Sequence, residues 1–156
     1  MTRPTASQVM TREVLTVGPD WPVSQLVEFL CDHSISGAPV VSDQDVPVGV
    51  VSLTDVARSG SLSERPASEA PSYYRHGLER MVAREELAAF RVEVESQTTV
   101  REIMTPMVFS VDETASVQEV ASAMITGRIH RVLVTRHNKM VGIISSLDLL
   151  SFVRDM

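Results

Sequence analysis

Residues 49–55 read Gly-Val-Val-Ser-Leu-Thr-Asp, and residues 142–148 read Gly-Ile-Ile-Ser-Ser-Leu-Asp. Both segments place a glycine and two β-branched residues before a serine, with an aspartate three residues after that serine. A run of β-branched residues is typical of a strand, and Ser-x-x-Asp is a variant of the capping box that begins a helix. The same strand-to-helix turn therefore occurs twice, which indicates an internal repeat.

The similarity continues on both sides of these segments. At an offset of 94 residues, Val9-Met10-Thr11 falls on Ile103-Met104-Thr105. Further apolar positions coincide at the same offset: Val14, Val17, Val23, Ile35 and Val40 fall on Val108, Val111, Val117, Ile129 and Val134. Removing one residue from the turn at 43–45 then brings the two Gly-h-h-Ser-x-x-Asp segments into register, where h is apolar and x is any residue. The chain therefore consists of two similar halves.

An amphipathic helix is expected at the same place in each half. Its apolar positions follow the spacing of one helical stripe: Val23, Leu26, Val27, Leu30 and Cys31 in the first half, and Val117, Val120, Ala121, Met124 and Ile125 in the second. Asp20 and Thr114 stand where the N-cap of such a helix is expected, and Pro22 suits the first helical turn.

Two short strands joined by a polar turn are expected after each helix. They lie at residues 38–41 and 48–52 in the first half, and at 131–135 and 140–145 in the second. A last helix is expected to begin near Leu53 and near Ser146. Each half is then a β-α-β-β-α unit, too small to bury both faces of its own sheet. The predicted fold class is α/β (α+β), with two pseudo-symmetric units packed through their sheets.

The two units are expected at residues 8–58 and 100–154, with an insert at 59–99 between them. Within the insert we expect a loop, a helix and a short strand, at residues 59–72, 73–90 and 91–95. A covering helix with a connector is the favoured interpretation of this insert. The alternative is a ligand-gated flap, in which Tyr73 or Tyr74 caps a ligand.

Composition excludes several classes of protein. The 156 residues carry a formal charge of -6, which disfavours a broad nucleic-acid-binding surface, and aromatic residues make up only 4%, which disfavours base stacking. No secretory signal and no apolar run long enough to span a bilayer is present. Cys31 is the only cysteine, so an internal disulfide and a cysteine-based zinc site are excluded. We expect a cytoplasmic protein with no metal site and no nucleic-acid or membrane partner.

The two halves differ in charge. Residues 120–147 contain no acidic residue and four cationic ones, Arg128, Arg131, Arg136 and Lys139. The matching residues 26–54 contain no Lys or Arg and four acidic ones, Glu28, Asp32, Asp43 and Asp45. An anion is therefore expected to be held mainly by the second half.

Two motifs have side chains suited to a nucleotide. A serine hydroxyl and a carboxylate at one turn, as at Ser145 and Asp148, suit the vicinal hydroxyls of a ribose, because a carboxylate accepts two O–H donors. Helix capping alone is the alternative reading of this turn. At the start of a strand, Arg131 offers bidentate phosphate recognition and His130 a donor of adjustable charge. A solvated strand end is the alternative there.

Together these motifs resemble a tandem pair of CBS domains, the adenosyl-nucleotide-sensing Bateman module. The matching features are the Val-Met-Thr and Ile-Met-Thr segments, Thr16-Val17 and Ser110-Val111, Ile35-Ser-Gly-Ala-Pro39, Ile129-His-Arg-Val-Leu133, and the two Gly-h-h-Ser-x-x-Asp turns. The resemblance covers about residues 8–58 and 100–154, and the insert has no counterpart in the minimal family pattern.

The resemblance implies two clefts, each lined by both halves. In the first cleft, Ser145 and Asp148 would hold the ribose, and His130 and Arg131 would meet the phosphate. The adenine and sugar would be framed there by Thr16, Ser36, Gly37, Ala38 and Pro39. The second cleft would use Ser52, Asp55 and Ser110, with the strand from Ile129 to Val132 opposite. Because Ser36-Gly37 replace the basic pair in the first half, we expect the better site at Ser145/Asp148 and a weaker or empty one at Ser52/Asp55.

The resemblance also implies a function. It is that of a non-enzymatic regulatory module that binds AMP, or else ADP or ATP, closes its halves around the phosphate and signals to an unidentified protein partner. A homodimer is implied as well. Two alternatives stay open: an interaction module with vestigial clefts that docks through residues 73–90, or a sensor of S-adenosylmethionine or a dinucleotide. An enzyme is least favoured, because no G-x-S-x-G elbow surrounds Ser145.

Overall fold

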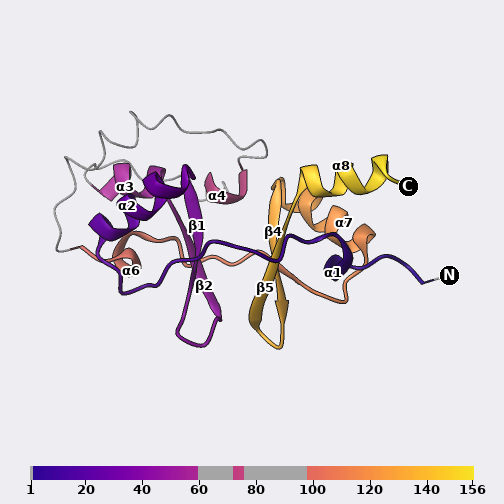
Figure 1. Cartoon of the computed structure of the whole chain (residues 1–156), viewed down its shortest axis with the longest axis horizontal. Coiled ribbons are helices and arrows are strands. Elements are labelled where there is room, and N and C mark those ends of the chain that lie inside the picture. Colours follow the sequence, from indigo (N-terminus) through magenta and orange to yellow (C-terminus); the bar gives the residue numbers. More distant parts are fainter. Residues whose placement is uncertain (1, 60–71, 76–97) are drawn as a thin grey trace.

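The computed structural model describes residues 2–59, 72–75 and 98–156. The first half contains α1 (Ala6–Val9), α2 (Val23–His33), β1 (Gly37–Val41), β2 (Pro47–Ser52) and α3 (Leu53–Ser59). From the insert, one turn of helix is described, α4 (Ser72–Arg75). The second half contains α6 (Val100–Ile103), β3 (Ser110–Asp112), α7 (Val117–Gly127), β4 (Arg131–Arg136), β5 (Lys139–Ser145) and α8 (Ser146–Arg154). Figure 1 shows the two strand hairpins side by side, with the longer helices to the outside.

The predicted fold class and its internal repeat are confirmed. The hairpins β1–β2 and β4–β5 are antiparallel, and each is followed directly by a helix, as expected at Leu53 and Ser146. Their registers correspond, because Gly37 faces Ser52 in one hairpin and Arg131 faces Ser145 in the other. The remaining predicted elements of the insert, in residues 60–71 and 76–97, lie outside the described residues.

The first strand of the repeat differs between the halves. In the second half, β3 runs parallel to β4 and Glu113 continues the ladder by donating its N–H to the Thr135 carbonyl. In the first half, only an isolated bridge joins Val17 to Val40. Pro19 stands where Glu113 stands in the second half and has no N–H to donate. The ladder therefore ends one step earlier in the first half.

The helix starts differ from those expected. The N-cap of α2 is Pro22 and that of α7 is Ser116, so the assignments to Asp20 and Thr114 are wrong. Asp20 instead pairs with Arg101 at 3.1 Å, and Thr114 donates to the Asp112 carboxylate within a turn. Ser116 accepts from the Glu119 N–H at 3.2 Å, and the Glu119 carboxylate accepts from the Ser116 N–H. A complete capping box therefore begins α7.

Replacing Ser116 with alanine is expected to lower the free energy of unfolding by about 1 kcal/mol, because the first turn of α7 loses its side-chain acceptor. Thr114→Ala is the matched control and is expected to change stability by less than about 0.5 kcal/mol. Urea denaturation followed by circular dichroism measures both values. An equal loss in the two variants would contradict the placement of the cap.

Two short helices were not predicted, and each packs against the opposite half. Helix α1 contacts α7, α8 and β5, whereas α6 contacts α3. Both begin with a capping box, formed by Thr5 with Gln8 and by Thr99 with Glu102. The Thr-x-x-Gln and Thr-x-x-Glu patterns were therefore the available sequence signal. The chain exchanges these segments reciprocally, which ties the two halves together.

Gly49 and Gly142, the glycines of the repeated motif, lie against the Met-Thr segments that follow α6 and α1. Thr105 forms two backbone hydrogen bonds with β2, and Thr11 forms two with β5. A Cβ atom on Gly49 would lie 2.6 Å from the carbonyl oxygen of Thr105, and one on Gly142 would lie 2.9 Å from that of Thr11. These two glycines therefore allow the close approach of the backbone of the repeated Met-Thr segments.

The core consists of two hydrophobic clusters joined across the sheets. The first contains the apolar stripe of α2, including Cys31 at 3% exposure, together with Val100 of α6. The second contains Val132, Leu133 and Val134 of β4 and residues of α7, together with Ala6, Val50, Tyr73 and Tyr74. Because Val50 belongs to β2, the sheet of the first half contributes to the core of the second.

Candidate functional site

The basic pair and the Ser-Asp turn of the second half meet at one end of the β4–β5 hairpin. Arg131 begins β4 and faces Ser145, which ends β5. The N–H of Ser146 donates to the His130 carbonyl at 2.8 Å, which fixes the start of α8 beside the start of β4. The first half repeats this arrangement, since Leu53 donates to the Ser36 carbonyl at 2.9 Å.

The Ser145–Asp148 turn is a complete capping box, and in both Ser-Asp turns the aspartate accepts from the serine N–H. Asp148 Oδ2 accepts hydrogen bonds from the Ser145 N–H at 2.7 Å and from Ser145 Oγ at 3.0 Å, and the Asp148 N–H donates to Ser145 Oγ at 3.2 Å. In the first half, Asp55 Oδ2 accepts from the Ser52 N–H at 2.8 Å. Both bonds to the Asp148 side chain use the same oxygen, so the capping function engages one oxygen of this half-buried carboxylate.

A residue of the insert brings the two halves together at this point. Tyr73 lies with its ring 4.8 Å from the Arg131 guanidinium carbon, measured to the ring centroid. The same ring fills the space beside Gly37, where a Cβ atom would come within 3.0 Å of Tyr73 Cδ2. Gly37 of the first half and Arg131 of the second half therefore contact one side chain, and α4 lies between β1 and β4 (Figure 1).

Tyr74 anchors α4 to the second half. Its side chain is 0% exposed. The Tyr74 hydroxyl donates to the Met107 carbonyl at 2.9 Å and accepts from the Phe109 N–H at 3.1 Å. Its own carbonyl accepts from the His130 N–H at 2.8 Å. Burial raises the pKa of the Tyr74 phenol far above its ordinary value, so the hydroxyl stays protonated and able to donate.

The other predicted residues lie at several places. Thr16 is half-buried and precedes the Val17–Val40 bridge at the edge of β1, while Ala38 and Pro39 are buried within that strand. Ser110 is exposed and begins β3. The side chains of Ile129 and Val132 belong to the core of the second half, at 4% and 1% exposure. A role for these two in the second cleft would therefore fall to their backbone groups.

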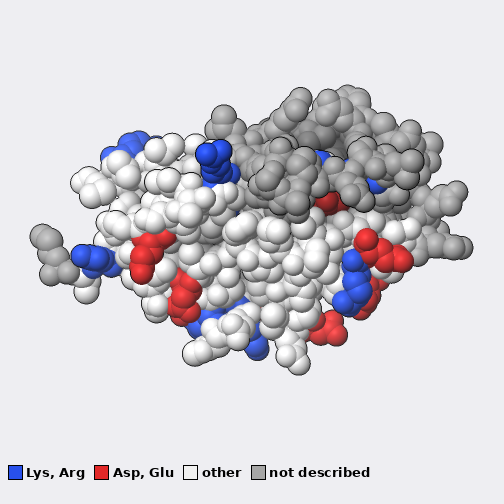
Figure 2. All heavy atoms as spheres, turned by 180° about the vertical axis from the view of Figure 1, so that it is seen from behind, with Lys and Arg blue, Asp and Glu red and all other residues white. Residues whose placement is uncertain are grey.

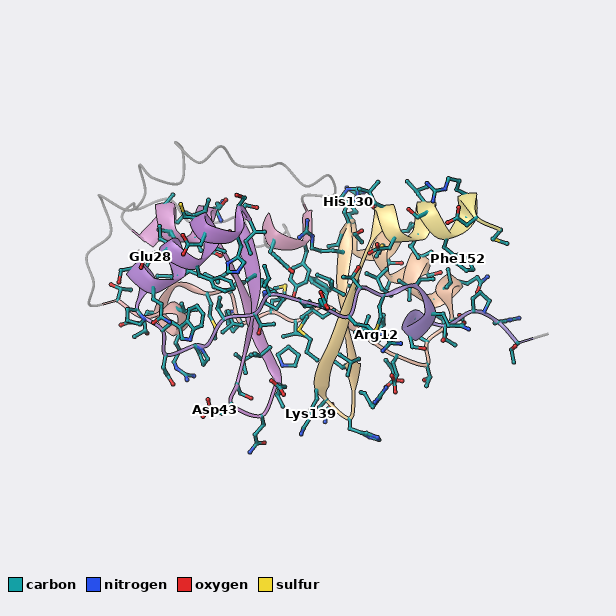
Figure 3. The ribbon with its side chains drawn as sticks, in the orientation of Figure 1. Arg12, Glu28, Asp43, His130, Lys139 and Phe152 are labelled. Carbon is teal, nitrogen blue, oxygen red and sulfur yellow. The ribbon has the colours of Figure 1, made fainter. Side chains whose placement is uncertain are left out.

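The four cations of the second half do not gather in one place. Arg131 lies at one end of β4, whereas Arg136 and Lys139 lie at the opposite end of the hairpin, as the labelled His130 and Lys139 show in Figure 3. Arg136 forms an ion pair with Glu113. The hydrogen bond from Arg136 holds the pKa of the Glu113 carboxyl below its usual range. Of the four cations, Arg131 is therefore the one that faces the Ser-Asp turn in the strand register. Arg128 precedes it at the C-cap of α7.

Charge on the surface is local. On the face drawn in Figure 2, acidic and basic side chains of the described residues are scattered and do not merge into one continuous basic area. Binding of an anion would therefore depend on individual side chains rather than on a broad positive field.

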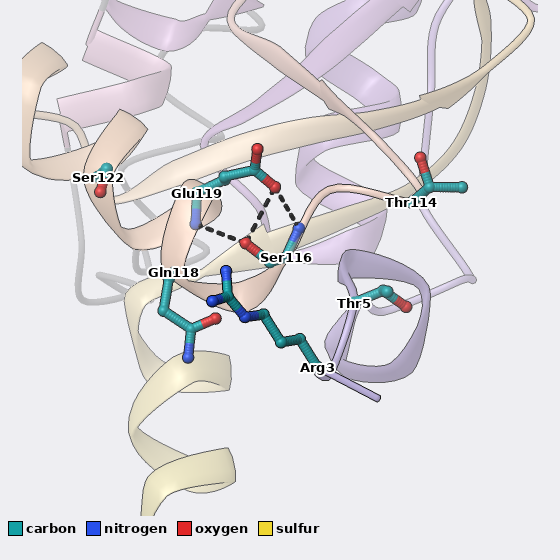
Figure 4. A pocket seen from close by; sticks show the side chains of 7 residues that line it. All are labelled: Arg3, Thr5, Thr114, Ser116, Gln118, Glu119 and Ser122. Atoms are coloured by element: carbon teal, nitrogen blue, oxygen red, sulfur yellow. Dashed lines mark hydrogen bonds between the residues drawn. The ribbon is translucent and has the colours of Figure 1, made fainter. Parts of the chain in front are cut away.

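A separate pocket of about 590 Å³ opens at the start of α7 (Figure 4). It is lined by Arg3, Thr5, Thr114, Ser116, Gln118, Glu119 and Ser122, none of which belongs to the predicted nucleotide-binding set. Hydrogen bonds from the backbone and hydroxyl of Ser116 hold the pKa of the Glu119 carboxyl low. Two polar residues of this pocket, Ser116 and Glu119, thus serve the cap of α7.

In the described part of the chain, no three His, Cys, Asp or Glu side chains gather closely enough to hold a metal ion. Among the helices of residues 2–59, 72–75 and 98–156, none has the length and apolar character to span a bilayer.

Comparison with known proteins yields one family. A sequence profile described as "CBS domain" matches the chain twice, at residues 6–61 and 100–155. Inosine-5'-monophosphate dehydrogenase of Methanocaldococcus jannaschii is 26% identical over 146 residues, which cover 93% of this chain and 23% of that enzyme. The chain thus spans less than a quarter of this relative.

Two solved structures share the fold across nearly their whole length. CBSX2 in complex with AMP has a TM-score of 0.67 at 21% identity, covering 98% of each chain. A CBS domain pair in complex with 5'-methylthioadenosine and S-adenosyl-L-methionine has a TM-score of 0.62 at 20% identity, covering 99% of this chain and 98% of the other. At these identities the similarity is one of fold.

Proposed function

The chain belongs to the CBS-domain family, of which it carries two copies, and from this premise we propose that it is a regulatory module that binds an adenine nucleotide. AMP is the proposed ligand, and a protein partner would receive the signal. The observation that carries the proposal is that Gly37 and Arg131, from opposite halves, lie against the same Tyr73 ring, while Arg131 faces Ser145 of the Ser145–Asp148 turn. One neighbour of the same fold holds AMP.

The geometry of this turn suits a ribose. Asp148 uses Oδ2 for the helix cap, and we assign the 2'- and 3'-hydroxyls to its other oxygen, Oδ1. Such bonds are charge-assisted and worth roughly twice a neutral hydrogen bond. The Arg131 guanidinium, at the start of the facing strand, would then meet the phosphate in a planar, bidentate way.

The first half offers a weaker site in this proposal. Ser52 and Asp55 repeat the turn, but Gly37 stands in the register position that Arg131 occupies in the second half. A phosphate bound there would lack a guanidinium from its own half. We therefore propose that the Ser145/Asp148 cleft fills first.

A thermal-shift panel with AMP, ADP, ATP, S-adenosylmethionine and NADH tests the identity of the ligand. AMP is expected to raise the melting temperature most, by an amount that grows with its concentration. A larger shift with S-adenosylmethionine would identify that compound as the ligand instead. A second neighbour of the same fold binds it. No shift with any of the five compounds would favour the alternative, a protein-interaction module.

We further propose that the chain forms a homodimer through α7 and α8. Helix α8 has no buried residue, and its Leu150 and Val153 are 63% and 61% exposed. Ile125 of α7, which the sequence placed in the buried stripe, is 78% exposed. The two helices contact each other, and we assign these three side chains to one apolar face that a second copy would cover.

Leu150→Glu is expected to convert the dimer to a monomer, because it places a charge in the proposed apolar interface. Gln44→Glu adds the same charge at the exposed β1–β2 turn and is expected to stay dimeric. Light scattering coupled to size-exclusion chromatography measures the mass. A monomeric wild-type chain, or a Leu150→Glu variant that remains dimeric, would contradict this interface.

A further inference from the structure

The insert supplies a side chain that stands where a nucleotide phosphate would bind. Building on the function proposed above, we infer that Tyr73 is an internal competitor of the ligand, and that the nucleotide binds only by displacing its ring from Arg131. The inference rests on three contacts of the Tyr73–Tyr74 pair: with Gly37, with Arg131 and with the backbone at His130.

The contact with Arg131 occupies the group that recognises phosphate. At 4.8 Å from the ring centroid, the guanidinium lies within the range of a cation–π interaction. Tyr73 is 7% exposed, so this contact is largely shielded from water, where such interactions are stronger. The ring covers one face of this guanidinium and fills the space beside it, so a phosphate that approaches Arg131 from this side would have to displace the ring.

The contact with Gly37 occupies the opposite wall. Gly37 is the first residue of β1, in the strand expected to frame the adenine and sugar. Because a Cβ atom there would lie 3.0 Å from Tyr73 Cδ2, the ring sits directly on the strand backbone. The same side chain thus covers a wall of the cleft in each half.

Tyr74 keeps this competitor in place. Its hydroxyl joins Met107 and Phe109, and its carbonyl accepts from His130, so α4 is fastened to the second half independently of Tyr73. A tethered group acts at a high effective concentration, so even a weak contact competes well with a free ligand. Displacement of Tyr73 would couple binding in the cleft to a change in the position of the Tyr73 side chain on α4.

Calorimetric titration of the full chain with AMP tests this inference. Tyr73→Ala is expected to bind AMP about tenfold more tightly than the wild type, because Arg131 is released. Tyr73→Leu keeps apolar volume in the core without a π face and should show the same gain if the alanine variant folds poorly. Tyr73→Phe keeps the ring and is the matched control, with an affinity close to that of the wild type.

The outcomes separate this inference from the function on which it rests. Wild-type binding of AMP with unchanged or weaker binding by both Tyr73→Ala and Tyr73→Leu would overturn the competition and leave nucleotide binding intact. Equal gains in Tyr73→Phe and Tyr73→Ala would also overturn it, since the ring would not be the competing group. Absence of AMP binding by all four proteins would overturn the proposed function as well.

Discussion

Replacing Asp148 with alanine is expected to weaken AMP binding at least about thirtyfold, which corresponds to roughly 2 kcal/mol. The proposed site gives this carboxylate two ribose hydroxyls, and hydrogen bonds to a charged group contribute about 1.5–3 kcal/mol each. Titration calorimetry of the purified variant measures the loss. Wild-type affinity in Asp148→Ala would show that the ribose lies elsewhere.

Asp148 also caps α8, so the loss of binding must be separated from a loss of structure. Asp148→Asn keeps an oxygen for the Ser145 N–H while removing the charge, and it is expected to remain folded and still bind AMP poorly. Asp55→Ala removes the equivalent cap in the first half and is expected to cost less affinity. If Asp55→Ala weakened AMP binding more than Asp148→Ala, the ranking of the two clefts would be wrong.

Replacing Gly49 with alanine is expected to lower the free energy of unfolding by roughly 3 kcal/mol, at the upper end of overpacking effects. The added Cβ atom would lie 2.6 Å from the Thr105 carbonyl oxygen and 3.2 Å from Pro106 Cα. Both are backbone atoms, and the Thr105 carbonyl is held by the Val50 N–H at 3.0 Å, so neither can rotate away. The backbone at Thr105 and Pro106 would therefore have to shift to make room for the added Cβ atom.

Two glycines serve as controls in the same urea denaturation experiment. Gly142→Ala is expected to cost less, because the nearest atom, 2.5 Å away, is the flexible side-chain sulfur of Met10. The nearest backbone atom, the Thr11 carbonyl oxygen, lies at 2.9 Å, compared with 2.6 Å at Gly49. Gly127→Ala in α7 meets nothing closer than 3.4 Å and is expected to be neutral or slightly stabilising. A Gly49→Ala variant as stable as Gly127→Ala would contradict the reciprocal exchange as a main tie between the halves.

The repeated unit could be predicted from the sequence because its signals are local. The stripe of α2, the two-strand hairpins and the starts of α3 and α8 each follow from residues close together in the chain. The missing strand before α2 also has a local cause in Pro19, which sequence reasoning did not use. The exchange of α1 and α6 between halves depends on packing between distant residues, which periodicity does not record.

The candidate site could be predicted in part. The register that places Arg131 opposite Ser145 follows from the hairpin pattern. The number of cations in residues 120–147 overstated the positive charge at the site. Arg131 and Arg136 stand at opposite ends of β4, about 17 Å apart at 3.3 Å per residue. The position of Tyr73 depends on how α4 packs against β1 and β4, which are distant in the chain. The sequence therefore suggested only the alternative in which Tyr73 or Tyr74 caps a ligand.

The central claim is that an adenine nucleotide occupies the cleft at Arg131 and Asp148. Its most direct test is a titration of the purified full chain with AMP, followed by two-dimensional amide NMR with assigned resonances. Saturable shifts centred on residues 130–131 and 145–148, larger than those on 52–55, are the predicted result. Shifts that do not saturate, or that gather at the start of α7 around Ser116 and leave Arg131 and Asp148 unchanged, would contradict the claim.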